Sequence, residues 1–378
     1  MPHTDDELKK ALKAFKKRIK LTRLDDDSRI GHGPLTGGGK EQIVSIQPPN
    51  GFGREIWEEL AERGVAVEVL ERGEYLGSSC CSWYAGGMLA PWCELADSES
   101  QLLKLGAGSI EWWSRTLPAT ERNGTLVVAH RRDRSELTRF ARRTHQFEWL
   151  DEAAITQLEP DLAGRFNSAL FFRGEGHLDP RAALEVLTRR LTESGVPIRF
   201  GVRSLADATA GADRVVDCRG LAARDVLTDL RGVKGEMILL RLREISLSRP
   251  VRFLHPRVPV YIVPRGAGLF MVGATMIESD ATTRISARSM LELLSAAYAL
   301  HPAFGEAEVV EIGTGVRPAF PDNLPRIRTH AGTVYVNGLY RHGFLIAPAL
   351  ARMTAEVVLH NRYFPEVMDE STGERRLA

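Results

Sequence analysis

The 378-residue sequence is poor in cysteine, has no excess of either charge and lacks a long uninterrupted hydrophobic run. Its four cysteines, Cys80, Cys81, Cys93 and Cys218, follow no metal-ligand spacing, and the adjacent pair is a poor disulfide candidate. We therefore expect no metal site and a reducing cytoplasm. The net charge of +1 gives no argument for binding nucleic acid or a membrane surface. We expect neither a signal peptide nor a membrane span, because no apolar run approaches membrane-spanning length.

The first 40 residues differ in character from the rest of the chain. Thr4 and Glu7 have the spacing of a capping box. Apolar residues then recur at helical spacing, which predicts a helix from about residue 5 to about residue 22. Its other faces are rich in lysine and arginine, and a glycine-rich stretch follows over residues 31–39. A basic helix of this kind suits an acidic partner, but we favour a solvated helix that docks through its apolar stripe.

Strand-like and helix-like segments alternate from residue 43 onward. The predicted strands include 65–70, 124–129, 198–200, 215–218, 235–242, 260–264, 269–275 and 334–337. The predicted helices are 102–113, 135–144, 153–158, 181–194, 286–299 and 347–359. Parallel units at both ends enclose strands that look antiparallel. The predicted fold class is therefore α/β, with a Rossmann-like FAD-binding domain interrupted by an α+β substrate domain that has an antiparallel sheet.

Residues 43–73 follow the strand–turn–helix–strand plan of a dinucleotide-binding unit. The turn lacks two of the three glycines of such a unit, and a proline and an asparagine stand in their places. Proline has no amide hydrogen to donate to a phosphate, but the amides of Gly51 and Gly53 would still face an anion at the helix N-terminus. Glu71 closes the second strand, where an acid accepts from a ribose hydroxyl. An ordinary strand–helix–strand with a surface glutamate explains this segment equally well.

A run of small residues follows over residues 77–91, and small residues let a backbone pass close to a flat ligand. From here the sequence resembles the FAD-dependent amine oxidases of the D-amino-acid oxidase group, and it looks closest to the glycine oxidases of thiamine thiazole synthesis. The resemblance extends from about residue 64 to residue 359, whereas the first sixty or so residues do not match. The other blocks that carry it are 176–180, 215–224, 232–237, 261–265, 272–275, 315–318 and 337–348.

This resemblance implies FAD as the cofactor and a site that holds an amino acid over the flavin ring. Arg317, in the Gly-x-Arg-Pro block, would bind the substrate carboxylate through its bidentate fork. Tyr261 would assist it, and Arg341 would line the same pocket. The glycine and proline around Arg317 suggest a shaped turn, and a surface ion pair with Asp322 is the alternative role. The residues expected to contact FAD are Gly51, Gly53, Glu71, Ser82, Gly86, Gly87, Met88, Gly220, Gly343, Phe344 and Leu345.

The resemblance also implies a reaction: oxidative deamination of glycine or another small amino acid, with oxygen as acceptor and with imine or oxo acid, ammonia and hydrogen peroxide as products. The FAD domain is expected to comprise 43–92, 179–236 and 312–362, and the substrate domain 93–178 and 237–311. Two alternatives stay open: a dehydrogenase of the same fold that reduces a quinone, and a non-catalytic protein with an impaired FAD site. The sequence leaves the oligomeric state open, a homo-oligomer included.

Overall fold

The computed structural model describes residues 42–47, 54–77, 80–95, 100–204, 209 and 211–369. Three features predicted from the sequence lie outside these ranges: the helix over residues 5–22 and the two glycines of the proposed phosphate loop, Gly51 and Gly53. The fold is therefore described from the first strand onward.

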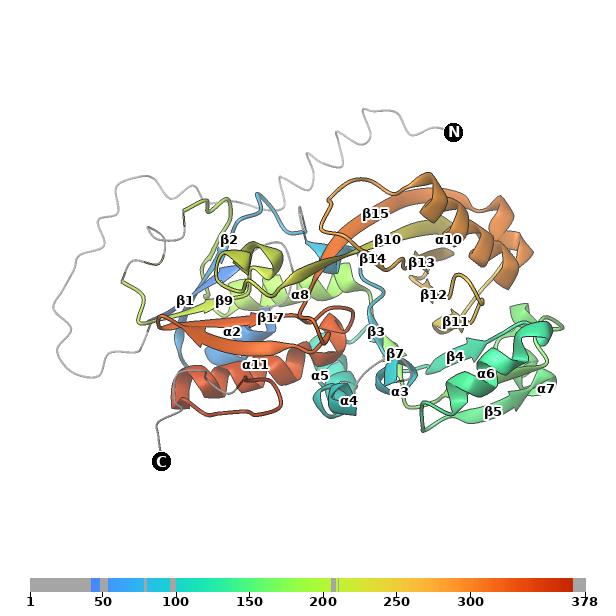
Figure 1. Cartoon of the computed structure of the whole chain (residues 1–378), viewed down its shortest axis with the longest axis horizontal. Helices are drawn as coiled ribbons and strands as arrows, with labels where there is room; N and C mark the ends of the chain where they lie inside the picture. The colour runs from blue at the N-terminus through green and yellow to red at the C-terminus, as the bar shows by residue number, and fades with distance from the viewer. Residues whose placement is uncertain are drawn as a thin grey trace. The chain divides into compact units, whose positions relative to one another are not determined.

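One of the two large sheets has six strands in the order β16-β17-β9-β1-β2-β8 (Figure 1). Its strands are β1 (Gln42–Gln47), β2 (Ala66–Glu71), β8 (Ile198–Arg199), β9 (Arg214–Asp217), β16 (Arg326–His330) and β17 (Thr333–Asn337). Five of them are parallel, and β16 pairs antiparallel with β17. Because parallel strands end at one edge, Glu71 at the end of β2 lies level with the end of β1. That edge is where such sheets bind nucleotides.

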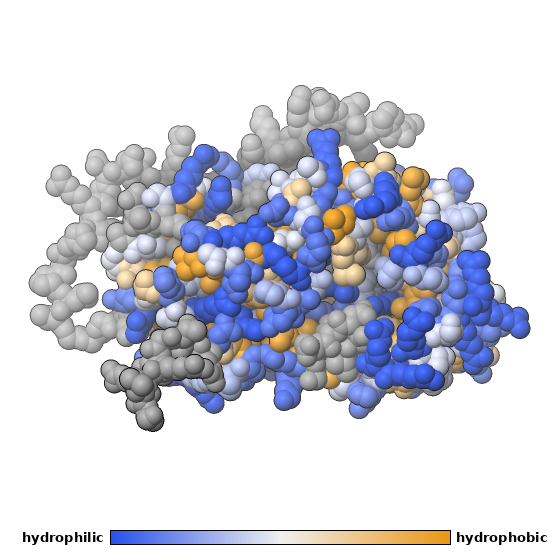
Figure 2. Space-filling model, in the orientation of Figure 1, coloured by the Kyte–Doolittle hydropathy of each residue, from blue (hydrophilic) through white to orange (hydrophobic). Residues whose placement is uncertain are grey.

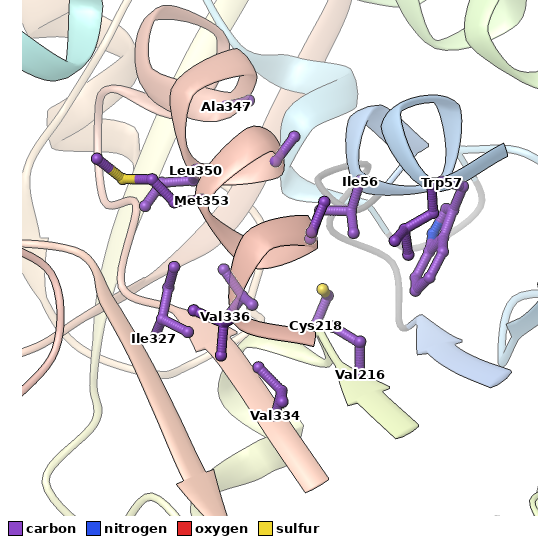
Figure 3. Close-up of a cluster of buried hydrophobic side chains, with 14 of the residues drawn as sticks. Ile56, Trp57, Val216, Cys218, Ile327, Val334, Val336, Ala347, Leu350 and Met353 are labelled. Atoms are coloured by element: carbon purple, nitrogen blue, oxygen red, sulfur yellow. The ribbon is translucent and has the colours of Figure 1, made fainter. Parts of the chain in front are cut away.

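Helices α2 (Arg54–Glu62), α8 (Pro180–Glu193) and α11 (Gly343–His360) complete this part of the molecule. α2 packs against both α8 and α11. Figure 3 shows Ile56 of α2 and Leu350 of α11 above Val216 of β9 and Val336 of β17, all four buried. Each such side chain contributes about 1.5–3 kcal/mol when it leaves water. This cluster fixes α11 on the sheet, so the first turn of α11 has a defined position.

The second large sheet has nine strands, with β15 paired along β10 beside the path β14-β10-β13-β12-β11-β4-β6-β5. Its strands are β4 (Thr125–Val128), β5 (Glu148–Asp151), β6 (Ser168–Phe172), β10 (Arg231–Arg241), β11 (Val251–Phe253), β12 (Val260–Pro264), β13 (Leu269–Gly273), β14 (Ile277–Glu278) and β15 (Glu308–Ala319). Pairing is antiparallel except between β4 and β11. The predicted antiparallel strands 235–242, 260–264 and 269–275 are therefore confirmed. Helix α10 (Ala287–Leu300) packs on this sheet.

Shorter elements lie between β2 and β8 along the chain. They are β3 (Met88–Leu89), β7 (Gly176–His177), α3 (Pro91–Leu95), α4 (Ser100–Gly106), α5 (Ser109–Thr116), α6 (Arg134–Ala141) and α7 (Glu152–Leu158). The single helix predicted over 102–113 is wrong. Two helices occur instead, because Gly108, with φ +78°, adopts the left-handed conformation and begins α5 anew.

Two further differences from the sequence prediction concern the site. α11 begins at Gly343, four residues before the predicted start at 347. Arg317 lies in the long strand β15 and not in a turn. The glycines of this strand suggested a break, but β10 pairs with β15 over its whole length and holds it extended.

Hydrophilic residues cover most of the face shown in Figure 2, and hydrophobic residues are scattered among them. By length and composition alone α11 is apolar enough to cross a membrane, with a mean hydropathy of 1.2 over 18 residues, although no apolar run of that length was expected from the sequence. In the folded protein 61% of that stretch is buried, which is the pattern of a core helix.

Candidate active site

A cavity with about 1050 Å³ of empty space, part of it open to solvent, lies between the nine-stranded sheet and the start of α11. Its walls are the loop 81–88, strands β10, β12, β13 and β15, and residues 340–345. Arg317, Tyr261 and Arg341, the three residues predicted to hold a substrate, all line it. Segments far apart in the sequence therefore meet at one concave site.

A partly buried arginine, Arg265, holds the loop 81–88 against the cavity. Its guanidinium donates to the carbonyl oxygens of Ala85 at 2.9 Å, Gly86 at 2.8 Å and Leu178 at 2.6 Å. Burial lowers the pKa of Arg265 to about 10, so it stays charged at neutral pH. Gly87 has φ +68°, and an added Cβ would lie 2.2 Å from the carbonyl oxygen of Leu178. Only glycine fits at this close approach.

The first turn of α11 faces the cavity through Gly343, Phe344 and Leu345. The carbonyl oxygen of Phe344 accepts hydrogen bonds from Trp113 Nε1 at 2.7 Å and from Ser109 Oγ at 3.3 Å, which ties the helix start to α5. A Cβ added at Gly343 would meet no atom within 4 Å, so the backbone borders open space there. The amides and the partial positive charge of a helix N-terminus favour a negatively charged group in that space.

Arg317 is a partly buried cation with no acidic partner among the described residues. Its Nη1 donates to the carbonyl oxygen of Thr275 at 3.1 Å. A Cβ added at Gly235 on β10 would come within 2.2 Å of its Nη2, so that glycine makes room for the guanidinium. Burial and a neighbouring guanidinium lower the pKa of Arg317 to about 10. Asp322 accepts from Arg326 instead, so the alternative surface pair is not formed.

Arg341 lines the same cavity, but its charge is paired. Its Nη2 donates to Glu94 Oε2 at 3.1 Å and lies 3.5 Å from the Tyr261 hydroxyl. That hydroxyl donates to Glu94 Oε1. His342 Nδ1 lies 3.7 Å from Glu94 Oε2, and Arg252 Nη1 lies 3.9 Å from Glu94 Oε1. Glu94 is therefore the centre of a buried network.

The network sets the charge states of its members. Burial alone would raise the pKa of Glu94, but the positive charges of Arg341 and Arg252 outweigh burial and lower it to about 2. Burial would lower the pKa of Arg341, but Glu94 outweighs it and raises the value. Glu94 and Arg341 are both ionised at neutral pH and cancel each other. A second acid of the cavity wall, Glu236, is likewise paired, with Lys234 at 2.8 Å.

The model of a known protein family, described as FAD dependent oxidoreductase (DAO), matches residues 58–357. The chain belongs to this family. It is 55% identical over 309 residues to the ThiO thiamine biosynthesis oxidoreductase of Rhizobium etli, covering 82% of this chain and 94% of that protein. It is 27% identical over 359 residues to the glycine oxidase of Bacillus licheniformis, covering 86% and 95%. The crystal structure of glycine oxidase from Geobacillus kaustophilus has the same fold, with a TM-score of 0.74 at 23% identity over 88% of this chain and 100% of that one.

An FAD-dependent family requires a site for the cofactor, and the cavity wall fits a flat ring. The predicted contact residues that line the cavity are Ser82, Gly86, Gly87, Met88, Gly343, Phe344 and Leu345. The small-residue loop and the open space at Gly343 leave room beside the helix N-terminus.

Two predicted FAD contacts, Glu71 and Gly220, do not line the cavity. Glu71 is buried at the carboxyl edge of the six-stranded sheet, and its Oε1 accepts from the Gly73 amide at 2.9 Å. Gly220 has φ +53°, and its carbonyl oxygen accepts from Asn337 Nδ2 at 2.9 Å. Glu71 is placed where this type of sheet binds a ribose.

Sequence reasoning missed Glu94 and gave no role to His342. The available signal was weak: Glu94 is a lone acid in the apolar segment Pro91–Leu95, directly after the small-residue loop. Charged residues are seldom fully buried unless they are paired, so such an acid is a candidate for a buried network. Its partners come from β11, β12 and the start of α11, which the sequence alone does not bring together.

Proposed function

We propose that this protein uses FAD to oxidise glycine or another small amino acid to the imine, which is released or hydrolysed to the oxo acid and ammonia, while oxygen is reduced to hydrogen peroxide. The observation that carries the proposal is Arg317, a partly buried guanidinium in the cavity without an acidic partner in the described part of the chain. A carboxylate is the anion that matches its planar fork.

The character of the cavity supports a small substrate. Bulky side chains occupy much of its wall, namely Tyr84, Met237, Met271, Met276 and Tyr340. Arg317 is the cation of this wall that has no acidic partner among the described residues. A compact amino acid, fixed by its carboxylate and with little side chain, suits this arrangement.

The chain contributes binding and orientation. FAD, when bound, supplies the redox chemistry by accepting a hydride from the substrate carbon and passing electrons to the acceptor. Arg317 fixes the carboxylate, and the carbonyl of Thr275 fixes Arg317. Such positioning means that the substrate and the flavin react from a fixed arrangement and do not have to meet by diffusion in the correct orientation. The amine enters neutral, so no side chain has to remove a proton from carbon.

Tyr261 has a more indirect part in this proposal than the sequence suggested. Its hydroxyl donates to Glu94, so in this arrangement it positions Glu94 and Arg341 and does not point to the substrate. Its ring remains part of the cavity wall.

We also propose thiamine thiazole synthesis as the pathway, which the thiamine biosynthesis role named for the Rhizobium etli relative supports, and the cytoplasm as the setting, which suits the four free cysteines. We further propose the domain division 43–92, 179–236 and 312–362 for FAD and 93–178 and 237–311 for substrate. Strands β10 and β15 pair with each other and both cross that boundary, so they would connect the two domains directly at the cavity.

Oxygen uptake by the FAD-loaded protein tests the proposal. With glycine as substrate we expect oxygen consumption and an equal amount of hydrogen peroxide. Turnover that requires an added quinone, with no oxygen uptake, would support the dehydrogenase alternative. Turnover with neither acceptor, over a panel of small amino acids, would reject the reaction and favour the non-catalytic alternative.

A further inference from the structure

The cavity contains two partly buried arginines, Arg317 and Arg341, but only Arg317 is available to a ligand. Arg317 has a single hydrogen bond to a backbone carbonyl and no acidic partner among the described residues. Arg341 donates to Glu94 and lies close to the Tyr261 hydroxyl. Both guanidinium groups line the same cavity, and Arg341 contributes to the lowered pKa of Arg317. A ligand that reaches Arg317 is therefore close to Arg341 as well.

Glu94 is held so that it stays in place when a ligand enters. Both of its oxygens have partners: Oε1 accepts from Tyr261, and Oε2 accepts from Arg341. Arg252 stabilises the position of Glu94 through its two neighbours. Its Nη1 donates to the carbonyl oxygen of Cys93 at 3.0 Å, and its guanidinium lies 5.1 Å from the centre of the Tyr261 ring. Glu94 is only 8% exposed, so solvent screens its charge poorly.

We propose that Glu94 determines specificity: by occupying Arg341 it restricts the cavity to amines with one carboxylate and excludes those with two. The inference rests on the proposed function, because it takes the carboxylate of the substrate to bind Arg317. Glu94 contacts no reacting atom in this proposal and acts through Arg341.

The exclusion has two physical causes. A second carboxylate placed beside Arg341 would also lie close to the carboxylate of Glu94, and the repulsion between the two acids offsets the attraction of the guanidinium. The guanidinium of Arg341 is also already hydrogen-bonded to Glu94, so the second carboxylate would lose its hydration without gaining a hydrogen-bond partner. Replacing Glu94 by a neutral side chain of the same shape removes the repulsion and releases Arg341. The cavity would then hold two free guanidinium groups instead of one.

Calorimetric titration of the FAD-loaded full chain with unreactive acids tests the inference. Acetate and malonate differ by one carboxylate, and succinate extends the span. In the wild type we expect malonate and succinate to bind no more tightly than acetate. In Glu94→Gln we expect one of the two dicarboxylates to bind at least about tenfold more tightly than acetate. Adding Arg341→Met to Glu94→Gln should abolish this gain.

Glu111→Gln is the matched control, because it removes an exposed acid that pairs with Arg122 away from the cavity. It should leave the ratio of dicarboxylate to acetate affinity unchanged. An activity readout uses iminodiacetate and N-methylglycine, amines that also differ by one carboxylate. Glu94→Gln should raise the ratio of their kcat/KM values in favour of iminodiacetate by at least about tenfold.

Two results would overturn the inference. One is a Glu94→Gln protein that folds and binds both dicarboxylates no better than acetate. The other needs no variant: wild-type protein that binds malonate or succinate more than tenfold tighter than acetate already has Arg341 available. Both readings are binding measurements. They stay separate from a failure of the proposed function, which would appear as wild-type protein that does not oxidise any small amino acid.

Discussion

Arg317 and Arg341 lie in the same cavity and carry the same group, yet their surroundings give them opposite properties. Burial and a neighbouring cation lower the pKa of Arg317, whereas Glu94 raises the pKa of Arg341. Arg317 has no acidic partner among the residues that the structure describes, so a substrate carboxylate can neutralise its charge. Arg341 is paired with Glu94 inside the protein, and this pair fixes the shape of the cavity wall. The comparison teaches that the number of arginines in a pocket does not give the number of anions it binds.

The largest expected effect comes from removing the available cation. Arg317→Ala should raise the KM for glycine steeply, because a carboxylate that enters without its partner loses on the order of 2–5 kcal/mol. Arg317→Lys keeps the positive charge but loses the bidentate fork, so its KM for glycine should lie between that of the wild type and that of Arg317→Ala. Steady-state oxygen uptake measures both. Arg122→Ala, which removes an exposed arginine away from the cavity, is the control. An unchanged KM in Arg317→Ala would place the carboxylate clamp elsewhere.

The second prediction concerns a buried acid behind the segment that carries Glu94: Oε1 of Glu175 accepts from the amides of Trp92 and Cys93 at 2.9 and 2.7 Å. Burial raises the pKa of Glu175 from 4.5 to about 8. The folded protein therefore holds a proton that the unfolded chain releases near pH 4.5. This contribution to stability is complete below that pH and is lost as the pH rises through 8.

We expect Glu175→Gln to gain stability relative to the wild type between about pH 5 and pH 8, by up to a few kcal/mol over the window. Denaturant unfolding at a series of pH values measures the difference. Glu111→Gln should follow the wild-type pH dependence, since Glu111 is exposed. A difference between Glu175→Gln and wild type that does not vary with pH would show that Glu175 is already ionised in the folded protein.

A smaller effect is expected from moving Arg317 without removing it. Gly235→Ala places a Cβ 2.2 Å from Nη2 of Arg317, so the guanidinium must shift. We expect the KM for glycine to rise about tenfold, equivalent to about 1.4 kcal/mol. Gly174→Ala is the matched control, because a Cβ there meets no atom within 4 Å. Equal KM values in the two variants would show that the position of Arg317 is not critical.

Much of this architecture could be predicted from local sequence signals. The strand 260–264 and the helix predicted over 286–299 have strong periodicity, and the structure has them within a residue of the prediction. Arg317, Tyr261 and Arg341 stood in recognisable blocks, and the structure places all three at one cavity. Their roles remain proposals.

What could not be predicted depends on contacts between distant segments. β15 contains Gly313 and Gly315, which look like strand breakers. In the folded protein the ring of Tyr84 lies within 2.3 Å, and Cys81 within 3.0 Å, of where a Cβ at these two positions would be, so packing explains the glycines. Glu94 was missed for the same reason, since only the fold brings Arg341 and Tyr261 to it.

The central claim is that this chain holds FAD and places an amino acid on Arg317 beside it. The visible absorption spectrum of the purified full chain, recorded before and after anaerobic addition of glycine, tests it most directly. The account predicts a flavin band that glycine bleaches in the wild type and that Arg317→Ala retains at the same glycine concentration. A protein that stays colourless after reconstitution with excess FAD, or a flavin band that no small amino acid bleaches, would contradict it.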